Sequence, residues 1–305
     1  MNDPKLKKVW LVSFGDSRLQ KAKKRLYRQA VEFGLEKEHI LLLEEKDLDL
    51  QFKKLFSEHL VLGSRGYGYM CWKPEVCLEA FRKMQDGDIL LYMDIGNHLR
   101  KKGKSRFYDY LHNVEAQDFL AFQYRSFLST TVPDPRHHFN LVSYHTKGDM
   151  LDYYGVRDNQ RILNSGQMIT AAFFMKKCEE AIAFCEKWKK VYCDDFSLND
   201  DSPSKSKNIH ARCLHRHDQS AFSIMWLRKG LPTVSACEIE HCRRRTPAPP
   251  ESRHDPMWGH AWFYQMSAYP IQARRDKGQV SFPRRVYRYL KYRHVMPLFR
   301  KILGR

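Results

Sequence analysis

The first 43 residues constrain the fold more than any other part of the sequence, because two apolar runs flank one amphipathic segment. Residues 7–14 carry an apolar run between a lysine pair and a Gly-Asp pair, which is typical of a buried parallel strand. Apolar residues then recur at helical spacing, up to a stop signal at Gly34: Leu19, Ala22, Leu26, Ala30 and Phe33. Residues 39–43 form a second strand-like run. This order predicts a parallel sheet that binds ligands at the carboxyl ends of its strands.

The same alternation of apolar and amphipathic segments continues along the chain, and no internal repeat is visible. Further strands are predicted at residues 89–93, 119–122, 161–175 and 231–234. Further helices are predicted at about residues 74–84, 178–192 and 218–227. We therefore predict an α/β domain over residues 1–273, with a mostly parallel, Rossmann-like sheet flanked by helices. A basic helical extension is predicted to follow over residues 274–305.

The charge of the chain is strongly positive and unevenly placed. Lys and Arg number 53 against 35 Asp and Glu, a formal balance of +18, and residues 274–305 hold 11 of these cations with a single acid, Asp276. Clustered cations attract phosphate, either of nucleic acid or of an anionic membrane. Apolar residues alternate with the cations on both sides of Pro297, which favours an amphipathic segment at a membrane surface. The alternative is a helix packed on the domain through the same apolar groups.

The expected compartment is the cytoplasm, at the inner face of the cell membrane. No run approaches the roughly 20 apolar residues that a membrane-spanning helix needs. The first residues do not have the pattern of a secretory signal. The eight cysteines include no Cys-x-x-Cys pair, so we expect reduced thiols and no structural zinc.

Asp94 is the first candidate site residue, because it directly follows the apolar run 89–93. A carboxylate at the end of a buried strand is costly unless it meets a metal ion, a cation or substrate. A Mg²⁺ or Mn²⁺ ion that bridges diphosphate oxygens would suit it. The alternative is a carboxylate that only caps the following turn.

The segment from Arg65 to Lys73 is the second candidate. Gly66-Tyr67-Gly68 lacks the third glycine of a dinucleotide-binding fingerprint. Its glycines would still allow the backbone to approach a ligand closely, while Arg65 and Lys73 supply cations for a diphosphate. The alternative is a turn with two solvated cations.

The third candidate is residues 215–219, which read His-Arg-His-Asp-Gln. If a helix begins near Asp218, its amino-terminal N–H groups favour anions, and Asp218 is either a functional carboxylate or simply the helix cap. Two histidines at this spacing can also bind a metal ion, although His-x-His alone is a weak signal.

Five segments carry a resemblance to a known family: residues 65–74, 87–96, 146–149, 166–167 and 215–223. In this order they resemble a group of bacterial glycosyltransferases of polysaccharide biosynthesis, which are taken to have a GT-A fold. The order is also similar to glycosyltransferase family eight, in which a strand-end Asp-x-Asp precedes an Asn-Ser/Ala-Gly strand and an Asp-Gln helix. The counterparts here are Asp94, Asn164-Ser165-Gly166 and Asp218-Gln219. The resemblance covers about residues 9–240.

The resemblance implies that a nucleoside diphosphate sugar lies across the ends of the first strands. Ser13, Phe14 and Asp16 would lie near the base or ribose, and Arg65 and Lys73 near the diphosphate. The donor sugar and the acceptor would meet Asn164, Gln167, Asp218 and Gln219, with Asp218 and Gln219 as the catalytic pair. A divalent ion, Mn²⁺ or Mg²⁺, would be held by Asp94 and His241. Gly96 departs from the pattern, because it stands where an Asp-x-Asp motif has its second carboxylate.

The predicted function is transfer of a hexosyl group to a lipopolysaccharide, capsule or other surface glycan or glycolipid, with no nucleic acid as partner. Two alternatives stay open. The basic composition is also that of a nucleic-acid-binding protein. The polar cluster at residues 215–218 could also belong to a metal-dependent hydrolase.

Overall fold

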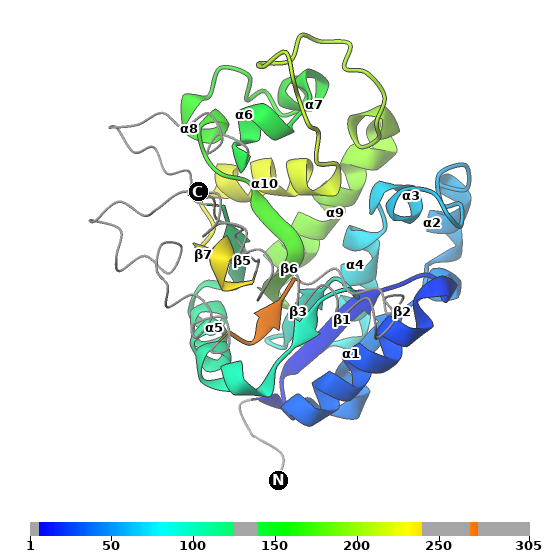
Figure 1. The fold of residues 1–305 in the computed structure, drawn as a ribbon, viewed down its shortest axis with the longest axis vertical. Coiled ribbons are helices and arrows are strands. Elements are labelled where there is room, and N and C mark those ends of the chain that lie inside the picture. The colour runs from blue at the N-terminus through cyan, green and yellow to red at the C-terminus, as the bar shows by residue number, and fades with distance from the viewer. Residues whose placement is uncertain (1–5, 125–139, 240–268, 274–305) are drawn as a thin grey trace, which may run out of the picture.

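Six strands form the central sheet of the computed structural model, which describes residues 6–124, 140–239 and 269–273 (Figure 1). In spatial order the strands are β2 (Ile40–Leu43), β1 (Val9–Phe14), β3 (Ile89–Met93), β6 (Met168–Lys176), β5 (Phe119–Gln123) and β7 (Thr233–Ser235). β6 runs antiparallel to its neighbours β3 and β5, and the other three pairings are parallel. The predicted α/β class with a mostly parallel sheet is confirmed. A separate two-stranded pairing joins β4 (His98–Leu99) to β8 (Ile271–Gln272).

The opening segment folds as its pattern predicts. All six residues of β1 are buried, as a strand covered on both faces requires. The buried residues of α1 (Gln20–Phe33) are the apolar stripe of the sequence: Ala22, Leu26, Ala30 and Phe33. Gly34 ends the helix with a left-handed φ of 105°, and its N–H donates to the carbonyls of Ala30 and Val31.

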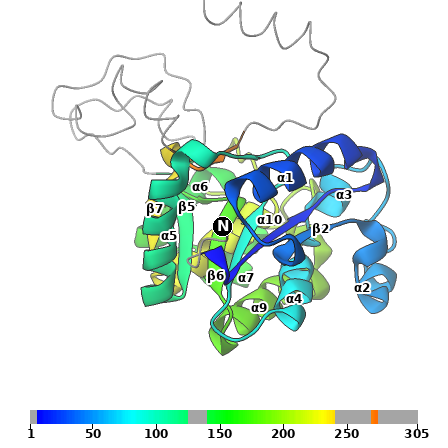
Figure 2. The ribbon, with the colours of Figure 1, turned by 90° about the horizontal axis from the view of Figure 1, so that it is seen from below.

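Helices cover both faces of the sheet (Figure 2). α1 and α5 (Lys104–Gln117) pack on one face, whereas α4 (Lys73–Lys83), α9 (Glu179–Asp194) and α10 (Asp218–Lys229) pack on the other. The short helices are α2 (Leu50–Leu55), α3 (Gly66–Tyr69), α6 (Val142–His145), α7 (Gly148–Tyr153) and α8 (Gln160–Leu163). Across the described ranges, no helix is long and apolar enough to cross a bilayer.

One predicted strand is wrong at its beginning. Residues 161–163, placed at the start of a strand over 161–175, belong to α8 instead, and β6 begins only at Met168. The physical reason is a local cap, because Asn159 Oδ1 accepts a hydrogen bond from the backbone N–H of Ile162 at 3.2 Å. His241 and the predicted extension over residues 274–305 lie outside the described residues.

The chain reversal at β6 determines where a site can form. Since β6 is antiparallel to β3, its first residues lie at the edge where β1 and β3 end. The backbone N–H of Asp94, just beyond β3, donates to the carbonyl of Ala171 in β6 at 2.8 Å. Ligands of open α/β sheets bind at this edge.

Candidate active site

Four polar side chains from four elements meet at the carboxyl edge of the sheet: Lys73, Asp94, Thr170 and Asp218, here called the strand-end cluster. Lys73 Nζ lies 2.8 Å from Asp218 Oδ2 and 3.3 Å from Asp94 Oδ1. It also donates to the carbonyl and the hydroxyl of Thr170, at 3.1 and 3.2 Å. The Thr170 hydroxyl in turn donates to Asp218 Oδ2 at 2.8 Å. One ammonium group therefore holds two carboxylates in fixed positions.

Local structure supplies each of these groups at the end of an element. Lys73 is the first residue of α4, with Pro74 at the start of the helix, where a missing N–H does no harm. Asp94 follows β3, and Asp218 is the first residue of α10. The side chains of Lys73 and Asp218 are only 3% and 2% exposed, whereas that of Asp94 is 39% exposed. Asp94 is thus the face of the cluster that a ligand can reach.

The Lys73 ammonium group remains charged. Burial alone lowers the pKa of Lys73, but the carboxylates of Asp218 and Asp94 outweigh burial, and the pKa is raised. Tyr92 donates its hydroxyl to Asp94 Oδ1 at 2.8 Å, and burial followed by the charge of Asp94 raises the pKa of Tyr92 well above its usual value. One ammonium against two carboxylates leaves one net negative charge at the strand ends.

The position of Lys73 differs from the prediction. The sequence suggested a cation for the diphosphate, but the ammonium group is buried and engaged with Asp94, Asp218 and Thr170. It acts in this arrangement by orienting the carboxylates. Arg65 is the predicted cation that does face solvent, with 59% of its side chain exposed and a 2.8 Å contact to Asp201.

The sequence left open whether Asp218 is a functional carboxylate or a helix cap. Its hydrogen bonds decide between these two interpretations. His217 occupies the N-cap position of α10 and makes no side-chain capping bond. Within the described part of the chain, the bonds of the Asp218 carboxylate go to Thr170 and Lys73, not to the first N–H groups of the helix. Asp218 is therefore a buried, ion-paired carboxylate and not a helix cap.

Gln219 and Gln167 form a second, uncharged chain beside the cluster. Gln219 Nε2 donates to Gln167 Oε1 at 2.8 Å. Gln167 is fully buried, and its own amide donates to Ser220 Oγ and Thr146 Oγ1, both at 3.2 Å. The buried Gln167 thus fixes the orientation of the half-buried Gln219 amide.

The backbone next to Arg65 is strained. Three residues without glycine's freedom have positive φ within four positions: Tyr67 (51°), Tyr69 (53°) and Met70 (61°). Such conformations cost about 1–3 kcal/mol each and concentrate at binding sites. This segment leads directly into α4, so the strained residues immediately precede Lys73, a member of the strand-end cluster.

The remaining predicted donor-binding residues are not all brought together. Ser13 and Phe14 are buried, and Phe14 stacks on Trp72 with ring centroids 4.2 Å apart. Asp16 forms an ion pair with Arg18 at 2.7 Å and caps the short helical turn that follows β1. Asn164 is exposed and lines a separate pocket of about 470 Å³ with Arg157 and His210. The predicted role of Asn164 beside Asp218 thus has no contact to support it.

The described residues do not fit a metal site by themselves. Asp94 Oδ1 is already occupied by Tyr92 and Lys73, and Gly96 offers no second carboxylate. In residues 6–124, 140–239 and 269–273, no three acidic, His or Cys side chains are placed to hold an ion. The other predicted ligand, His241, lies outside these ranges. We therefore derive no step through a metal ion.

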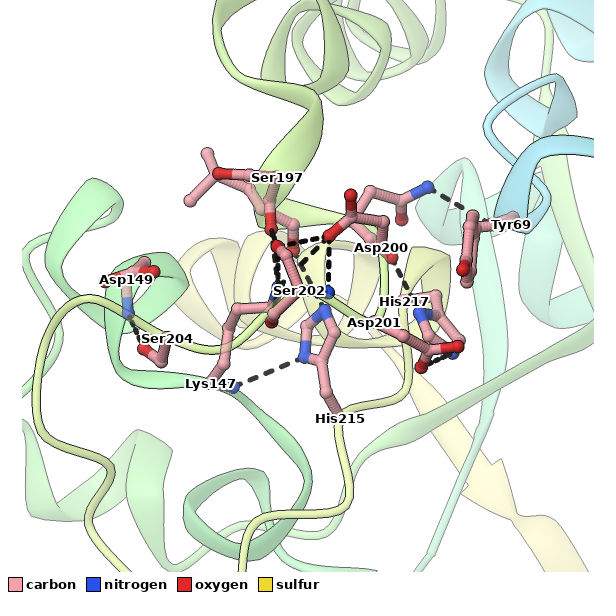
Figure 3. A network of polar contacts seen from close by, with 12 residues as sticks. Tyr69, Lys147, Asp149, Ser197, Asp200, Asp201, Ser202, Ser204, His215 and His217 are labelled. Carbon is pink, nitrogen blue, oxygen red and sulfur yellow. Dashed lines mark hydrogen bonds and ion pairs between the residues drawn. The ribbon is translucent and has the colours of Figure 1, made fainter. Parts of the chain in front are cut away.

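A second buried lysine organises the loop before α10 (Figure 3). Lys147, Asp200, Ser202 and His215 are here called the loop cluster. Lys147 Nζ donates to the carbonyls of Ser197 and Ser202, and Asp200 lies 3.6 Å away. His215 accepts from the backbone N–H of Lys147 at Nδ1 and donates from Nε2 to the carbonyl of Leu198. Burial lowers the pKa of His215 well below its usual value.

Sequence analysis missed Thr170 and Tyr92. Thr170 is the polar residue in an otherwise apolar first half of β6, and Tyr92 is the last polar side chain before Asp94. Both residues carry a hydroxyl group within a buried strand, and a buried hydroxyl needs a hydrogen-bond partner. The sequence therefore contained a signal for each. The identity of those partners, however, depends on the sheet order.

At the sequence level, no family model and no curated protein match the chain. Among solved structures, the chain is similar to mouse xyloside xylosyltransferase 1 in its apo form (10% identity, 87% of this chain and 97% of that chain covered, TM-score 0.41). A glycosyltransferase involved in glycosylation of the major capsid of PBCV-1 is similar at 9% identity, with 87% and 92% covered and a TM-score of 0.41. The galactosyltransferase LgtC, in complex with donor and acceptor sugar analogues, is similar at 9% identity, with 86% and 85% covered and a TM-score of 0.40. We take nothing about the site from likenesses this distant.

Proposed function

We propose that this protein is a glycosyltransferase that moves a hexosyl group from a nucleoside diphosphate sugar to a surface glycan such as lipopolysaccharide or capsule. The strand-end cluster is the observation that carries the proposal. It places two carboxylates around one buried ammonium group, one carboxylate accessible, at the edge of the sheet where ligands of this fold class bind. The motif order of the sequence supports the same function.

The chemistry of sugar transfer suits these groups. The bond between the anomeric carbon and the diphosphate oxygen breaks, its electron pair stays with the diphosphate, and positive charge develops on the sugar. The acceptor hydroxyl oxygen forms the new bond to the anomeric carbon, and its proton passes to the released diphosphate. Fixed carboxylates stabilise that charge without reorganising, which is the largest contribution in many enzymes. Asp94 faces the donor, Asp218 completes the negative field, and Gln219 holds sugar hydroxyls. Lys73 is a positioning residue in this proposal, and Arg65 receives the diphosphate.

The alternative functions have less support. A nucleic-acid-binding surface needs clustered cations, yet the strand-end cluster is negative and the most basic segment lies outside the described residues. A hydrolase built on residues 215–218 needs free imidazole ligands. His215 has both ring nitrogens engaged within the chain.

We also propose that the acceptor is lipid-linked and is presented at the cytoplasmic face of an anionic membrane. This part rests on the composition of residues 274–305 alone. Deleting these residues is expected to abolish binding to phosphatidylglycerol vesicles at low salt while sparing transfer to a soluble acceptor analogue. Undiminished vesicle binding by the shortened protein would exclude the segment as the anchor.

A binding screen tests the central proposal. Uridine, guanosine, adenosine and thymidine diphosphate hexoses are added to the purified protein, with and without Mn²⁺, and the shift of the melting temperature is measured. We expect at least one donor to stabilise the protein, as binding to the native state must. The same donor is expected to stabilise the Asp94→Asn variant less. No shift with any donor would contradict the proposal.

A further inference from the structure

His217 contains a buried hydrogen-bond acceptor that the proposed mechanism does not yet use. Its Nδ1 lies 2.6 Å from the carbonyl oxygen of Asn199, which can only accept, so Nδ1 carries the proton. In the neutral ring, Nε2 is then a lone-pair acceptor. The side chain is 3% exposed, and Nε2 has no hydrogen-bond partner among the described residues. Asp201 Oδ1 lies 3.6 Å from Nε2, beyond hydrogen-bond range.

The imidazole is neutral at ordinary pH. Burial is the main cause of its lowered pKa, and the nearby Arg65 lowers it further, although the carbonyl of Asn199 and the charges of Asp218 and Asp201 act in the opposite direction. A neutral ring with its proton on Nδ1 offers a permanent acceptor at Nε2. Buried polar atoms of this kind are normally paired, so an unpaired one points to an external donor.

The backbone is held in an unusual conformation to place this ring. His217 has φ 51° and ψ −124°, a combination that residues with a Cβ rarely adopt. Strain of this kind persists where the surrounding structure enforces it, and it clusters at ligand-binding positions. Since Asp218 is the next residue, the strained position adjoins the strand-end cluster.

The cover over His217 is made of side chains that can move. Figure 3 shows Tyr69 and Asp201 on the side of His217 away from Lys147, and the Tyr69 ring lies 4.9 Å from the imidazole. Asp201 is held by Arg65 at 2.8 Å, and both side chains are at least half exposed. Exposed ion pairs contribute little to stability. A diphosphate, which binds a guanidinium through two oxygens, would compete with Asp201 for Arg65.

We propose that His217 Nε2 accepts a hydrogen bond from a hydroxyl of the transferred sugar after Arg65 has moved from Asp201 to the diphosphate. This inference rests on the proposed function and assigns a further sugar-binding residue to it. The chemistry excludes other occupants. A phosphate oxygen is itself an acceptor and cannot pair with Nε2, whereas a metal ion would need further ligands that the described residues around His217 do not supply.

Removing one sugar hydroxyl at a time tests the inference. The dissociation constant of the donor found in the binding screen is compared with those of its deoxyfluoro analogues, in which fluorine, which cannot donate a hydrogen bond, replaces each hydroxyl in turn. In the wild type we expect the substitution at one position of the sugar to weaken binding about tenfold, the magnitude of one buried hydrogen bond. In His217→Asn the parent donor should bind about tenfold more weakly, and the analogue at that position should bind no worse than the parent. Asn is chosen because it tolerates positive φ.

His215→Gln is the matched control, because both ring nitrogens of His215 bond within the chain. It is expected to lower the melting temperature but to keep the full penalty at the sensitive hydroxyl. If His217→Asn keeps that penalty as well, the inference is overturned while the proposed function stands. If the wild type binds no donor, the proposed function fails first.

A measurement on the wild type covers the case in which His217→Asn does not fold. The ¹⁵N resonance of His217 Nε2 is followed during addition of the donor and of the nucleoside diphosphate without sugar. We expect the resonance to move upfield only with the complete donor. No movement with a donor that binds would overturn the inference.

Discussion

Two buried lysines, Lys73 and Lys147, have pKa values shifted in opposite directions, because their ammonium groups are buried among different partners. Each has a side chain only 3% exposed. Lys73 meets the carboxylates of Asp218 and Asp94, and its pKa is raised. Lys147 meets mainly backbone carbonyls, Asp200 is more distant, and burial lowers its pKa. The first lysine is a charge in a charged site, whereas the second is a connector in a loop.

This difference in partners indicates which of the two buried lysines belongs to a functional site. Carbonyl oxygens satisfy an ammonium group without adding net charge, which is what the structure of a loop requires. Two carboxylates around one ammonium are expensive to assemble for stability alone, because desolvation offsets much of the attraction. The strand-end cluster is therefore the better candidate for chemistry, and the loop cluster for stability.

Lys73→Met gives the largest expected effect. It leaves Asp218 buried without its cation, which costs about 3–5 kcal/mol in the free energy of unfolding. Urea denaturation followed by circular dichroism measures this loss. Lys73→Arg, which keeps the charge, should lose less. A loss below about 1 kcal/mol for Lys73→Met would remove the distinction between the two lysines.

Asp94→Asn is expected to separate chemistry from stability. The transfer rate should fall at least about 10²-fold, because a carboxylate that faces the donor acts through its charge. The free energy of unfolding should change by only about 1 kcal/mol, since the pair with Lys73 is partly exposed on the Asp94 side. Initial rates with a saturating donor provide the measurement. Asp200→Asn, in the loop cluster, is the control and should keep its rate.

Lys147→Met should show the reverse pattern. It leaves the carbonyls of Ser197 and Ser202 without their donor, at a cost of about 2 kcal/mol in unfolding free energy. The rate per folded molecule should stay within about twofold of the wild type, because the strand-end cluster is unchanged. A large loss of rate with unchanged stability would place Lys147 in the site.

Mild acid should destabilise the folded protein through three histidines: His145, His215 and His217. Burial lowers the pKa of His145 to about 4 and also lowers the pKa of His215 and His217. The folded state therefore binds fewer protons than the unfolded state between about pH 4 and 6.5, so stability rises with pH in this window. From pH 7 to 5, His145 alone should account for a loss of about 1–2 kcal/mol. His145→Gln should flatten this part of the pH profile.

Much of the fold could be predicted from the sequence, because the evidence is local. The apolar run of β1, the spacing in α1 and the glycine at position 34 act within a few residues of one another. The predicted order of strand and helix also placed Asp94 directly after a strand and Asp218 near the start of a helix, where the structure has them. The start of the strand predicted over residues 161–175 was wrong, because the pattern gave no weight to the cap at Asn159.

The roles inside the site could not be predicted in the same way. Lys73 becomes a partner of Asp94, Thr170 and Asp218 only because β6 runs antiparallel and brings α10 back to the end of β3. No spacing in the sequence predicts that these four side chains contact one another. The same limit explains Asn164, which shares the motif order with Gln167 but points into a different pocket.

Hydrogen–deuterium exchange with a bound nucleoside diphosphate sugar tests the central claim most directly, because it locates the ligand on one region or the other. The account predicts slower exchange in peptides that cover residues 64–73, 94–99 and 216–220, around the strand-end cluster. Peptides around Asn164 and the pocket that it lines should exchange as in the free protein. Protection confined to that pocket, with none at the strand ends, would contradict the account.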